Sequence, residues 1–253
     1  MRIPRIVIAG ATSGVGKTSI TCSIIYCLQK YGFSVQPFKV GPDYIDPGYL
    51  SSISKHETYN LDVWLMGKNK LLNSFISNSQ SDVSVIEGVM GYYDGFGGDS
   101  NHASTHHVAS LTKSPVLLVL DASKTSRSIA ATALGFVKFH KNSRISGIIL
   151  NKIGSKKHEI LCRTALEKIK IPIIGAIPKN LLLNMPSRHL GLISTLESKT
   201  LKTQIQNVSK IISNYLDINE IIKIAKNSPD LTKKRKPLIK KVKTTIAVAL
   251  DTS

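Results

Sequence analysis

Short apolar runs alternate with amphipathic segments along most of this chain. Six runs rich in Val, Ile and Leu are continuous and bounded by turn residues, which predicts strands buried on both faces of a sheet. They are Ile3–Ala9, Ser34–Val40, Val83–Glu87, Pro115–Asp121, Ile145–Asn151 and Pro172–Ile177. Helical spacing of apolar residues follows in Thr18–Tyr31, Ser126–His140 and Lys156–Ile169. This alternation predicts an α/β fold, with a mostly parallel sheet and helices on both faces.

Three segments depart from that alternation. Gly88–His107 contains five glycines and no periodicity, and a loop of this length is usually functional or disordered. Leu196–Lys226 predicts one or two helices. The segment 228–243 is rich in Lys, Arg and Pro, which is typical of an exposed linker, and an apolar strand is predicted at 244–250. We therefore expect a domain at 1–227, a basic linker at 228–243 and the opening strand of a second domain at 244–253.

Composition adds a charge imbalance to this picture. The 253 residues include 34 Lys and Arg against 16 Asp and Glu, a net charge of +18. A positive field attracts a small polyanionic substrate or a nucleic acid, although a general bias toward lysine would give the same number. The three cysteines lack zinc-ligand spacing and indicate free thiols in a reducing cytoplasm. The apolar part of the N-terminus is shorter than that of a signal peptide, and no apolar run of about 18 residues occurs, so we expect neither a leader nor a membrane span.

The strongest chemical motif follows the first predicted strand. Residues 10–18 read GATSGVGKT and precede a helix, which is the context of a phosphate-binding loop for ATP. Backbone N–H groups at a helix N-terminus surround phosphate, the Lys17 ammonium would bridge the β- and γ-phosphates, and the Thr18 hydroxyl would bind Mg²⁺. The usual first glycine is Ala11 here, with Gly10 one position earlier. The predicted nucleotide-binding residues are Thr12, Ser13, Gly14, Val15, Gly16, Lys17 and Thr18.

Two acidic motifs follow the next two predicted strands along the chain. Asp43 and Asp46 come directly after Val40, at the strand end where ligands bind in parallel sheets. Asp43 could bind Mg²⁺ directly or through water, whereas Asp46 precedes Pro47 and could simply cap a helix. Glu87 ends an apolar strand, the position of a second Mg²⁺ contact in phosphate-loop proteins. Asp94, in the glycine-rich loop, could contact substrate or make a turn.

Two further positions carry weaker signals. Asn151 ends a predicted strand, where an Asn often contacts adenine in phosphate-loop folds. Arg188 lies beside turn residues in PSRHLGL (186–192), where it could bind an anion or belong to a turn. His106 and His107 lie at a predicted helix start, and the pattern does not separate ligands from surface residues there.

Together these motifs resemble the cobyrinate a,c-diamide synthase family over essentially the whole chain. The blocks that carry the resemblance are AGATSGVGKTS (9–19), FKVGPDYIDPGYL (38–50), NLDVWLM (60–66), EGVMGYYDG (87–95), GIILNKIGSKKH (147–158) and PSRHLGLI (186–193). The resemblance implies a P-loop NTPase-like fold similar to dethiobiotin synthetase. It also implies ATP-dependent amidation of the a and c acetate groups of a corrinoid through acyl phosphates, with Mg²⁺.

The resemblance further implies site residues and a partner. Positions matching Asp43, Tyr44, Asp46, Glu87 and Asp94 are associated with the nucleotide, metal and corrinoid site, with Lys17, Asp43, Asp46 and Asp94 in catalysis and Arg188 near substrate. The family usually has His where this chain has Leu50. Its C-terminal glutaminase domain begins with a strand similar to TIAVALD (245–251), so we expect ammonia from such a domain or from a separate source. A homodimer is a further possibility.

Three other functions fit parts of the pattern. Nickel-sirohydrochlorin a,c-diamide synthase uses the same chemistry and stays open. Dethiobiotin synthetase shares the fold, but GPDYIDP and RHLGL argue against it. A DNA-partitioning ATPase would need a Lys five residues before Lys17, and that residue is Thr12. We therefore expect a polycarboxylate tetrapyrrole as the partner, with nucleic acid bound at most nonspecifically through KKRK (233–236).

Overall fold

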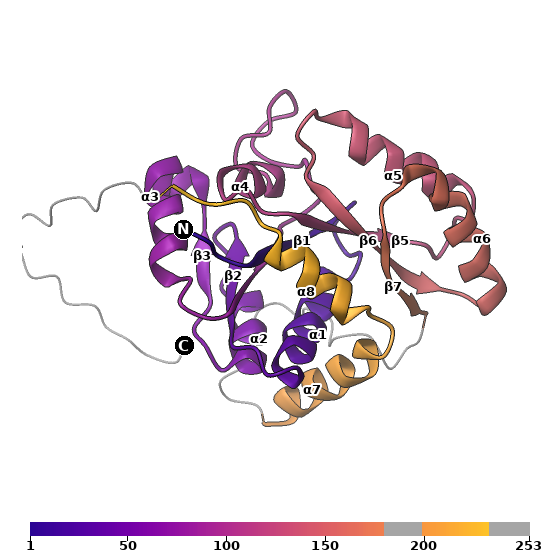
Figure 1. Cartoon of the computed structure of the whole chain (residues 1–253), viewed down its shortest axis with the longest axis horizontal. Helices are drawn as coiled ribbons and strands as arrows, with labels where there is room; N and C mark the ends of the chain where they lie inside the picture. Colours follow the sequence, from indigo (N-terminus) through magenta and orange to yellow (C-terminus); the bar gives the residue numbers. More distant parts are fainter. Residues whose placement is uncertain (180–198, 233–253) are drawn as a thin grey trace, which may run out of the picture.

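A seven-stranded parallel sheet runs through the molecule, with helices covering both of its faces (Figure 1). The computed structural model describes residues 1–179 and 199–232. The strand order is β3-β2-β4-β1-β5-β6-β7. The strands are β1 (Arg5–Gly10), β2 (Val35–Val40), β3 (Tyr59–Leu61), β4 (Val83–Glu87), β5 (Val116–Asp121), β6 (Ile145–Ile153) and β7 (Ile173–Pro178).

The helices divide between the two faces because successive side chains of a strand point to opposite sides. On β1, Ile6 and Ile8 pack with α1 (Lys17–Lys30), α2 (Ile45–Ser54), α7 (Lys199–Ser213) and α8 (Ile218–Lys226). Val7 and Ala9 belong to the cluster on the other face. The helices of that second cluster are α3 (Val63–Asn78), α4 (Thr105–Leu111), α5 (Ser128–Phe139) and α6 (Lys156–Leu166), and a 3₁₀ turn (Glu167–Ile169) follows α6.

The predicted α/β fold is confirmed, and each of the six predicted strands is present with small shifts at its ends. The apolar pattern did not predict β3, α2 or α3. β3 has three residues, α2 contains Pro47 and Gly48, and α3 is interrupted at Gly67, whose φ is 71°. Such features weaken a periodic signal because they shorten or break it.

The packed domain extends beyond the predicted boundary at residue 227. Leu231 is buried, and its N–H donates to the carbonyl of Met1 at 3.0 Å. The Ser228 hydroxyl donates to the Arg5 carbonyl at 2.8 Å. The start of the predicted linker therefore packs against β1, while the rest of that segment and the predicted strand at 244–250 lie outside the described residues.

Two expectations about the interior can be compared with the structure. Cys22, Cys27 and Cys162 are free thiols, and all three are buried. Among residues 1–179 and 199–232, no helix combines the length and the apolar character that a membrane span requires.

Candidate functional site

The predicted site residues gather at the carboxyl ends of β1, β2, β4 and β6. β1 lies between β4 and β5, so the chain passes from one side of β1 to the other after β4. Ligands of open parallel sheets bind at such a reversal. The fold thus places four separate sequence motifs at one edge.

The phosphate-binding loop links β1 to α1. Gly14 and Gly16 have φ values of 74° and 93°, a left-handed conformation that favours glycine. α1 begins at Lys17 with no acidic residue in its first turn, so its positive N-terminal end is available to an anion. The Lys17 ammonium donates to the carbonyls of Met90 at 2.6 Å and Thr12 at 3.3 Å. Lys17 therefore lies at the loop, where phosphates would bind.

Glu87 connects this loop to the end of β4. Its Oε1 accepts a hydrogen bond from the Thr18 hydroxyl at 2.7 Å. Its Oε2 is buried and has no hydrogen-bond partner among the described residues. Burial and the nearby charge of Asp46 raise the pKa of Glu87, against the opposing effect of Lys39.

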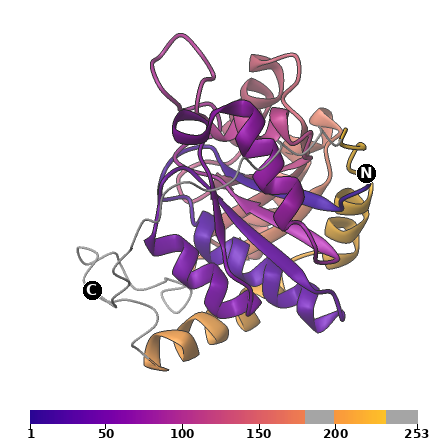
Figure 2. The ribbon, with the colours of Figure 1, turned by 90° about the vertical axis from the view of Figure 1, so that its left-hand side faces the viewer.

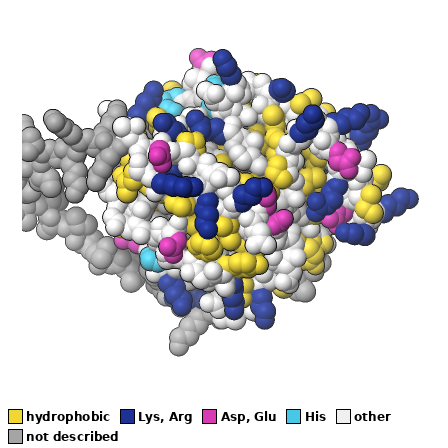
Figure 3. Space-filling model, viewed as in Figure 1, with side chains coloured by type: hydrophobic (Ala, Val, Ile, Leu, Met, Phe, Trp, Pro, Cys, Tyr) yellow, Lys and Arg dark blue, Asp and Glu magenta, His cyan; other side chains and the backbone are white. Residues whose placement is uncertain are grey.

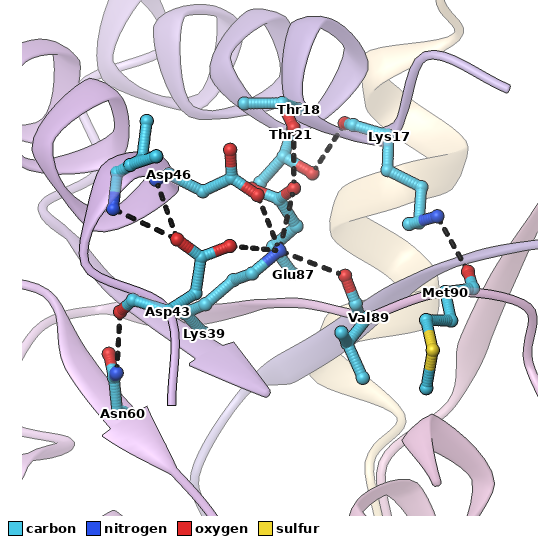
Figure 4. Close-up of polar contacts among 12 residues, drawn as sticks. Lys17, Thr18, Thr21, Lys39, Asp43, Asp46, Asn60, Glu87, Val89 and Met90 are labelled. Carbon is cyan, nitrogen blue, oxygen red and sulfur yellow. Dashed lines mark hydrogen bonds and ion pairs between the residues drawn. The ribbon is translucent and has the colours of Figure 1, made fainter. Parts of the chain in front are cut away.

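A buried lysine, which the sequence analysis did not single out, lies at the centre of the site (Figure 4). The Lys39 ammonium contacts Asp46 Oδ2 at 2.7 Å, Glu87 Oε1 at 3.2 Å and Asp43 Oδ2 at 3.9 Å. It also donates to the Gly88 carbonyl at 3.2 Å. Burial opposes its charge, but the carboxylates of Glu87 and Asp46 outweigh burial and raise the pKa of Lys39.

Asp46 does not cap α2, which was one of the two roles expected of it. Asp43, and not Asp46, holds the start of α2, because its Oδ1 accepts from the N–H groups of Ile45 at 2.9 Å and Asp46 at 3.2 Å. Asp46 is 1% exposed and pairs with Lys39. Tyr44 is 79% exposed beside them. Leu50, where the resembled family usually has His, lies on α2 and is fully buried in the hydrophobic core.

The other predicted residues lie around the same edge. Asn151, at the end of β6, donates its side-chain N–H to the Val15 carbonyl at 2.8 Å and so supports the phosphate-binding loop. Asp94 Oδ2 accepts from the Gly91 N–H at 2.9 Å, which makes a turn in the glycine-rich loop. Thr12, Ser13 and Gly14 are exposed on the loop. Arg188 lies outside the described residues.

The oxygens around Thr18 fit part of a magnesium site. A hydroxyl and a carboxylate are hard oxygen ligands, and Mg²⁺ in phosphate sites is usually held by one or two carboxylates and by phosphate. Thr18 and Glu87 are in contact, and Glu87 Oε2 is unpartnered. Within the described part of the chain, no cluster of three or more His, Cys, Asp or Glu is arranged to hold a metal ion. Asp43 reaches Glu87 only through Lys39, so its assignment as a ligand stays a prediction.

A signal for Lys39 was present in the sequence. A lysine one residue before the end of a buried strand, followed by two aspartates, must find anionic partners because an unpaired buried charge is costly. The segment FKVGPDYID has this form. What the sequence could not supply was Glu87 as the third partner, because that pairing depends on β2 lying next to β4.

Comparison with known proteins places the chain among nucleotide-binding domains. Residues 6–193 match the family described as "CobQ/CobB/MinD/ParA nucleotide binding domain". Similar curated proteins are cobyrinate a,c-diamide synthases of Dehalococcoides mccartyi (strain CBDB1), 41% identical over 94% of this chain and 52% of that protein, and of Picrophilus torridus, 42% identical over 99% and 58%. A hydrogenobyrinate a,c-diamide synthase of Thermobifida fusca is 40% identical over 90% and 49%. The chain spans about half the length of these relatives.

Solved structures support the fold alone. Chloroplast FtsY from Physcomitrella patens superimposes with a TM-score of 0.52 at 16% identity, over 71% of this chain and 60% of that chain. The signal recognition particle receptor FtsY from Elizabethkingia anophelis, solved with GDP, gives 0.52 at 15% identity over 71% and 58%. At this identity the likeness extends to the arrangement of strands and helices.

Proposed function

The chain belongs to the CobQ/CobB/MinD/ParA family of nucleotide-binding domains, and from this premise we propose that it amidates the a and c acetate carboxylates of cobyrinate, using ATP. The enzyme class would be a carboxylate–amine ligase of cobalamin biosynthesis acting in the cytoplasm. The observation that carries the proposal is the joining of Lys17 and Thr18 of the phosphate-binding loop to the Lys39–Asp46–Glu87 cluster through the Thr18–Glu87 hydrogen bond.

The reaction would have two steps, phosphorylation of the carboxylate and displacement of phosphate by ammonia. A substrate carboxylate oxygen attacks the γ-phosphorus of ATP and ADP leaves, so the carboxylate becomes an acyl phosphate. Ammonia then attacks the acyl carbon and inorganic phosphate leaves, which forms the amide. Activation is needed because carboxylate and ammonia otherwise give an unreactive salt. Mg²⁺ bound at Thr18 and Glu87, with Asp43, would neutralise phosphate charge.

We assign the remaining residues by their place at the site. Thr12 to Thr18 would hold the phosphates, with Lys17 stabilising charge on the transferred group and Asn151 fixing the loop through Val15. Tyr44, Asp46, Asp94 and Arg188 would act on the corrinoid side. Ammonia would come from a glutaminase domain or a separate protein, because the three cysteines are buried and lie on α1 and α6. A homodimer remains part of the proposal.

The test is amidation by the chain supplied with ATP, Mg²⁺, ammonium and cobyrinate. We expect ADP and phosphate to accumulate together with mono- and diamides, which mass spectrometry separates. A Lys17→Met variant should lose both products, since it removes the phosphate-binding ammonium. Amidation of nickel-sirohydrochlorin instead of cobyrinate would redirect the proposal to that substrate. A folded, ATP-binding protein that amidates neither compound would contradict it.

A further inference from the structure

Two aromatic rings are exposed next to the site and are not used by the proposed chemistry. Trp64, in the first turn of α3, is 58% exposed, and Phe96, in the loop between β4 and α4, is 60% exposed. Their ring centroids are 4.5 Å apart, with an interplanar angle of 35°. The loop projects at the top of Figure 2 beside the start of α3. Paired large aromatic rings left open to solvent are a common mark of a binding surface.

The rings are tied to the site from two directions. The Asn60 amide on β3 donates to the Asp43 carbonyl at 2.6 Å, and Asp62 then caps α3 by accepting from the Leu65 N–H at 2.8 Å. This places Trp64 one short connection from the Asp43 loop. Phe96 follows Asp94 by two residues in the glycine-rich loop. Phe96 thus shares a loop with the predicted substrate residue Asp94, and Trp64 lies on a segment that is hydrogen-bonded to the Asp43 loop.

Basic side chains border the two rings. The His102 ring lies 5.9 Å from the Trp64 ring, edge-on, and 5.4 Å from the His107 ring. Lys68 is exposed on α3, four residues after Trp64. The His107 Nδ1 accepts from the Ala103 N–H at 3.2 Å, and burial, followed by the charge of Lys68, lowers the pKa of this ring. We call these five residues the Trp64 patch: Trp64, Lys68, Phe96, His102 and His107.

We propose that the Trp64 patch binds the tetrapyrrole substrate, with the conjugated ring plane stacked on Trp64 and Phe96 and peripheral carboxylates held by Lys68, His102 and His107. This inference rests on the proposed function and names the surface that the substrate would use. A flat conjugated ring stacks well on paired aromatic rings. Its several carboxylates match the Lys68 ammonium, whose hydrogen bonds to a carboxylate are of the stronger, charge-assisted kind, and the ring N–H groups of His102 and His107. A peptide or a second copy of the chain would need only the apolar part of the patch.

The experiment uses Trp64 as its own reporter, because it is the only tryptophan of the chain. Cobyrinate, or metal-free hydrogenobyrinate, is titrated into the 253-residue chain without ATP, and quenching of Trp64 fluorescence gives Kd. We expect Phe96→Ala to raise Kd roughly tenfold, as loss of one stacking ring costs on the order of 1 kcal/mol or more. Phe96→Leu keeps apolar area without the ring, so its Kd should lie between those of the unchanged chain and Phe96→Ala.

Tyr31→Ala is the matched control. Tyr31 is 56% exposed, similar to Phe96, but it follows the C-terminal end of α1, at the opposite edge of the sheet from the site. The Kd of the Tyr31→Ala variant for cobyrinate should equal that of the unchanged chain. In ammonium-dependent turnover, Trp64→Ala should raise KM for cobyrinate about as much as Phe96→Ala, with KM for ATP unchanged.

The outcomes separate this inference from the proposed function. Amidation of cobyrinate with an unaltered KM in Phe96→Ala and Trp64→Ala would overturn the patch while leaving the function intact. Phe96-dependent binding of cobyrinate without any amidation would support the patch and contradict the function. A Phe96→Ala variant that binds cobyrinate normally but changes its sedimentation would make the patch a contact between protein chains and overturn the inference.

Discussion

Lys39 carries a charge into the interior beside three carboxylates, and it organises the site more directly than any residue of the phosphate-binding loop. Its own exposed fraction is 2%, and those of Asp46 and Glu87 are 1% each. Removing one member of a buried ion pair leaves an uncompensated charge, so a single substitution in such a cluster strongly destabilises the fold. We therefore regard Lys39 as a positioning residue that keeps Glu87 against Thr18.

Substitution of Lys39 by Met tests this role. We expect the free energy of unfolding, measured by urea denaturation, to fall by about 3–5 kcal/mol, because Glu87 and Asp46 would lose their cation. Adding Glu87→Gln should recover part of the loss, since the glutamine carries no charge. Lys70→Met, at an exposed position of α3, should stay within about 0.5 kcal/mol of the unchanged chain. A Lys39→Met variant as stable as Lys70→Met would contradict the interpretation.

At the scale of elements, the residues at the carboxyl ends of the strands were largely predictable, whereas the contacts between neighbouring segments were not. Glu87, Asp43 and Asn151 each follow an apolar run, so their position at strand ends is readable from the sequence. The hydrogen bonds of Asp43 at the start of α2 depend on local geometry within GPDYIDPG, where Pro and Gly obscure the helix. β3 has only three residues, which is too short for a periodic signal. The arrangement of Trp64 against Phe96 depends on contacts between segments that are distant in the chain.

The ends of β5 and β6 carry an ion pair with a defined pH dependence. Asp121 Oδ2 accepts from the Lys152 ammonium at 2.7 Å. Burial opposes ionisation of Asp121, but hydrogen bonds from Lys152 and Ser123 outweigh it and lower the pKa of Asp121. A carboxyl with a pKa lowered on folding stabilises the protein above its unfolded pKa, and this contribution is lost as the pH falls through the folded pKa.

Asp121→Asn should therefore lower the free energy of unfolding at pH 7 by less than about 1 kcal/mol, since the pair is partly exposed. The difference from the unchanged chain should shrink as the pH falls below about 4, the ordinary range of an Asp carboxyl. Urea denaturation at a series of pH values measures it. Lys152→Met should reproduce the same pH dependence, because it removes the same hydrogen bond. A difference that grows in acid would refute the assignment.

At the scale of the whole molecule, positively charged side chains are in excess. Figure 3 shows Lys and Arg side chains spread over the visible face, with acidic side chains scattered between them. A net charge of +18 creates a field that extends beyond individual contacts. This field would draw a polycarboxylate toward the molecule before the site selects it.

We expect kcat/KM for cobyrinate to fall about tenfold as ionic strength rises from about 0.01 to about 0.15 M, because the screening length shortens from about 30 to about 8 Å. Steady-state kinetics at a series of KCl concentrations measure this change. The a,c-diamide product has two fewer carboxylates, so its inhibition constant should vary less with salt. Equal salt dependence for both compounds would show that long-range attraction does not select the substrate.

The central place of β1 in the sheet has a consequence for synthesis on the ribosome. β1 pairs with β4 and β5, through Ile6 with Val85 and Val7 with Val116. At translation rates of about 5–20 residues per second, β5 emerges roughly 5–20 s after β1. β4 emerges about 78 residues after β1, so β1 lacks both neighbours for roughly 4–16 s and lacks β5 for the rest of the interval. Its apolar side chains are meanwhile open to chaperones or to association with other nascent chains. The strand that carries the phosphate-binding loop is thus made before β2, β3 and β4 but is paired on both sides only after all three.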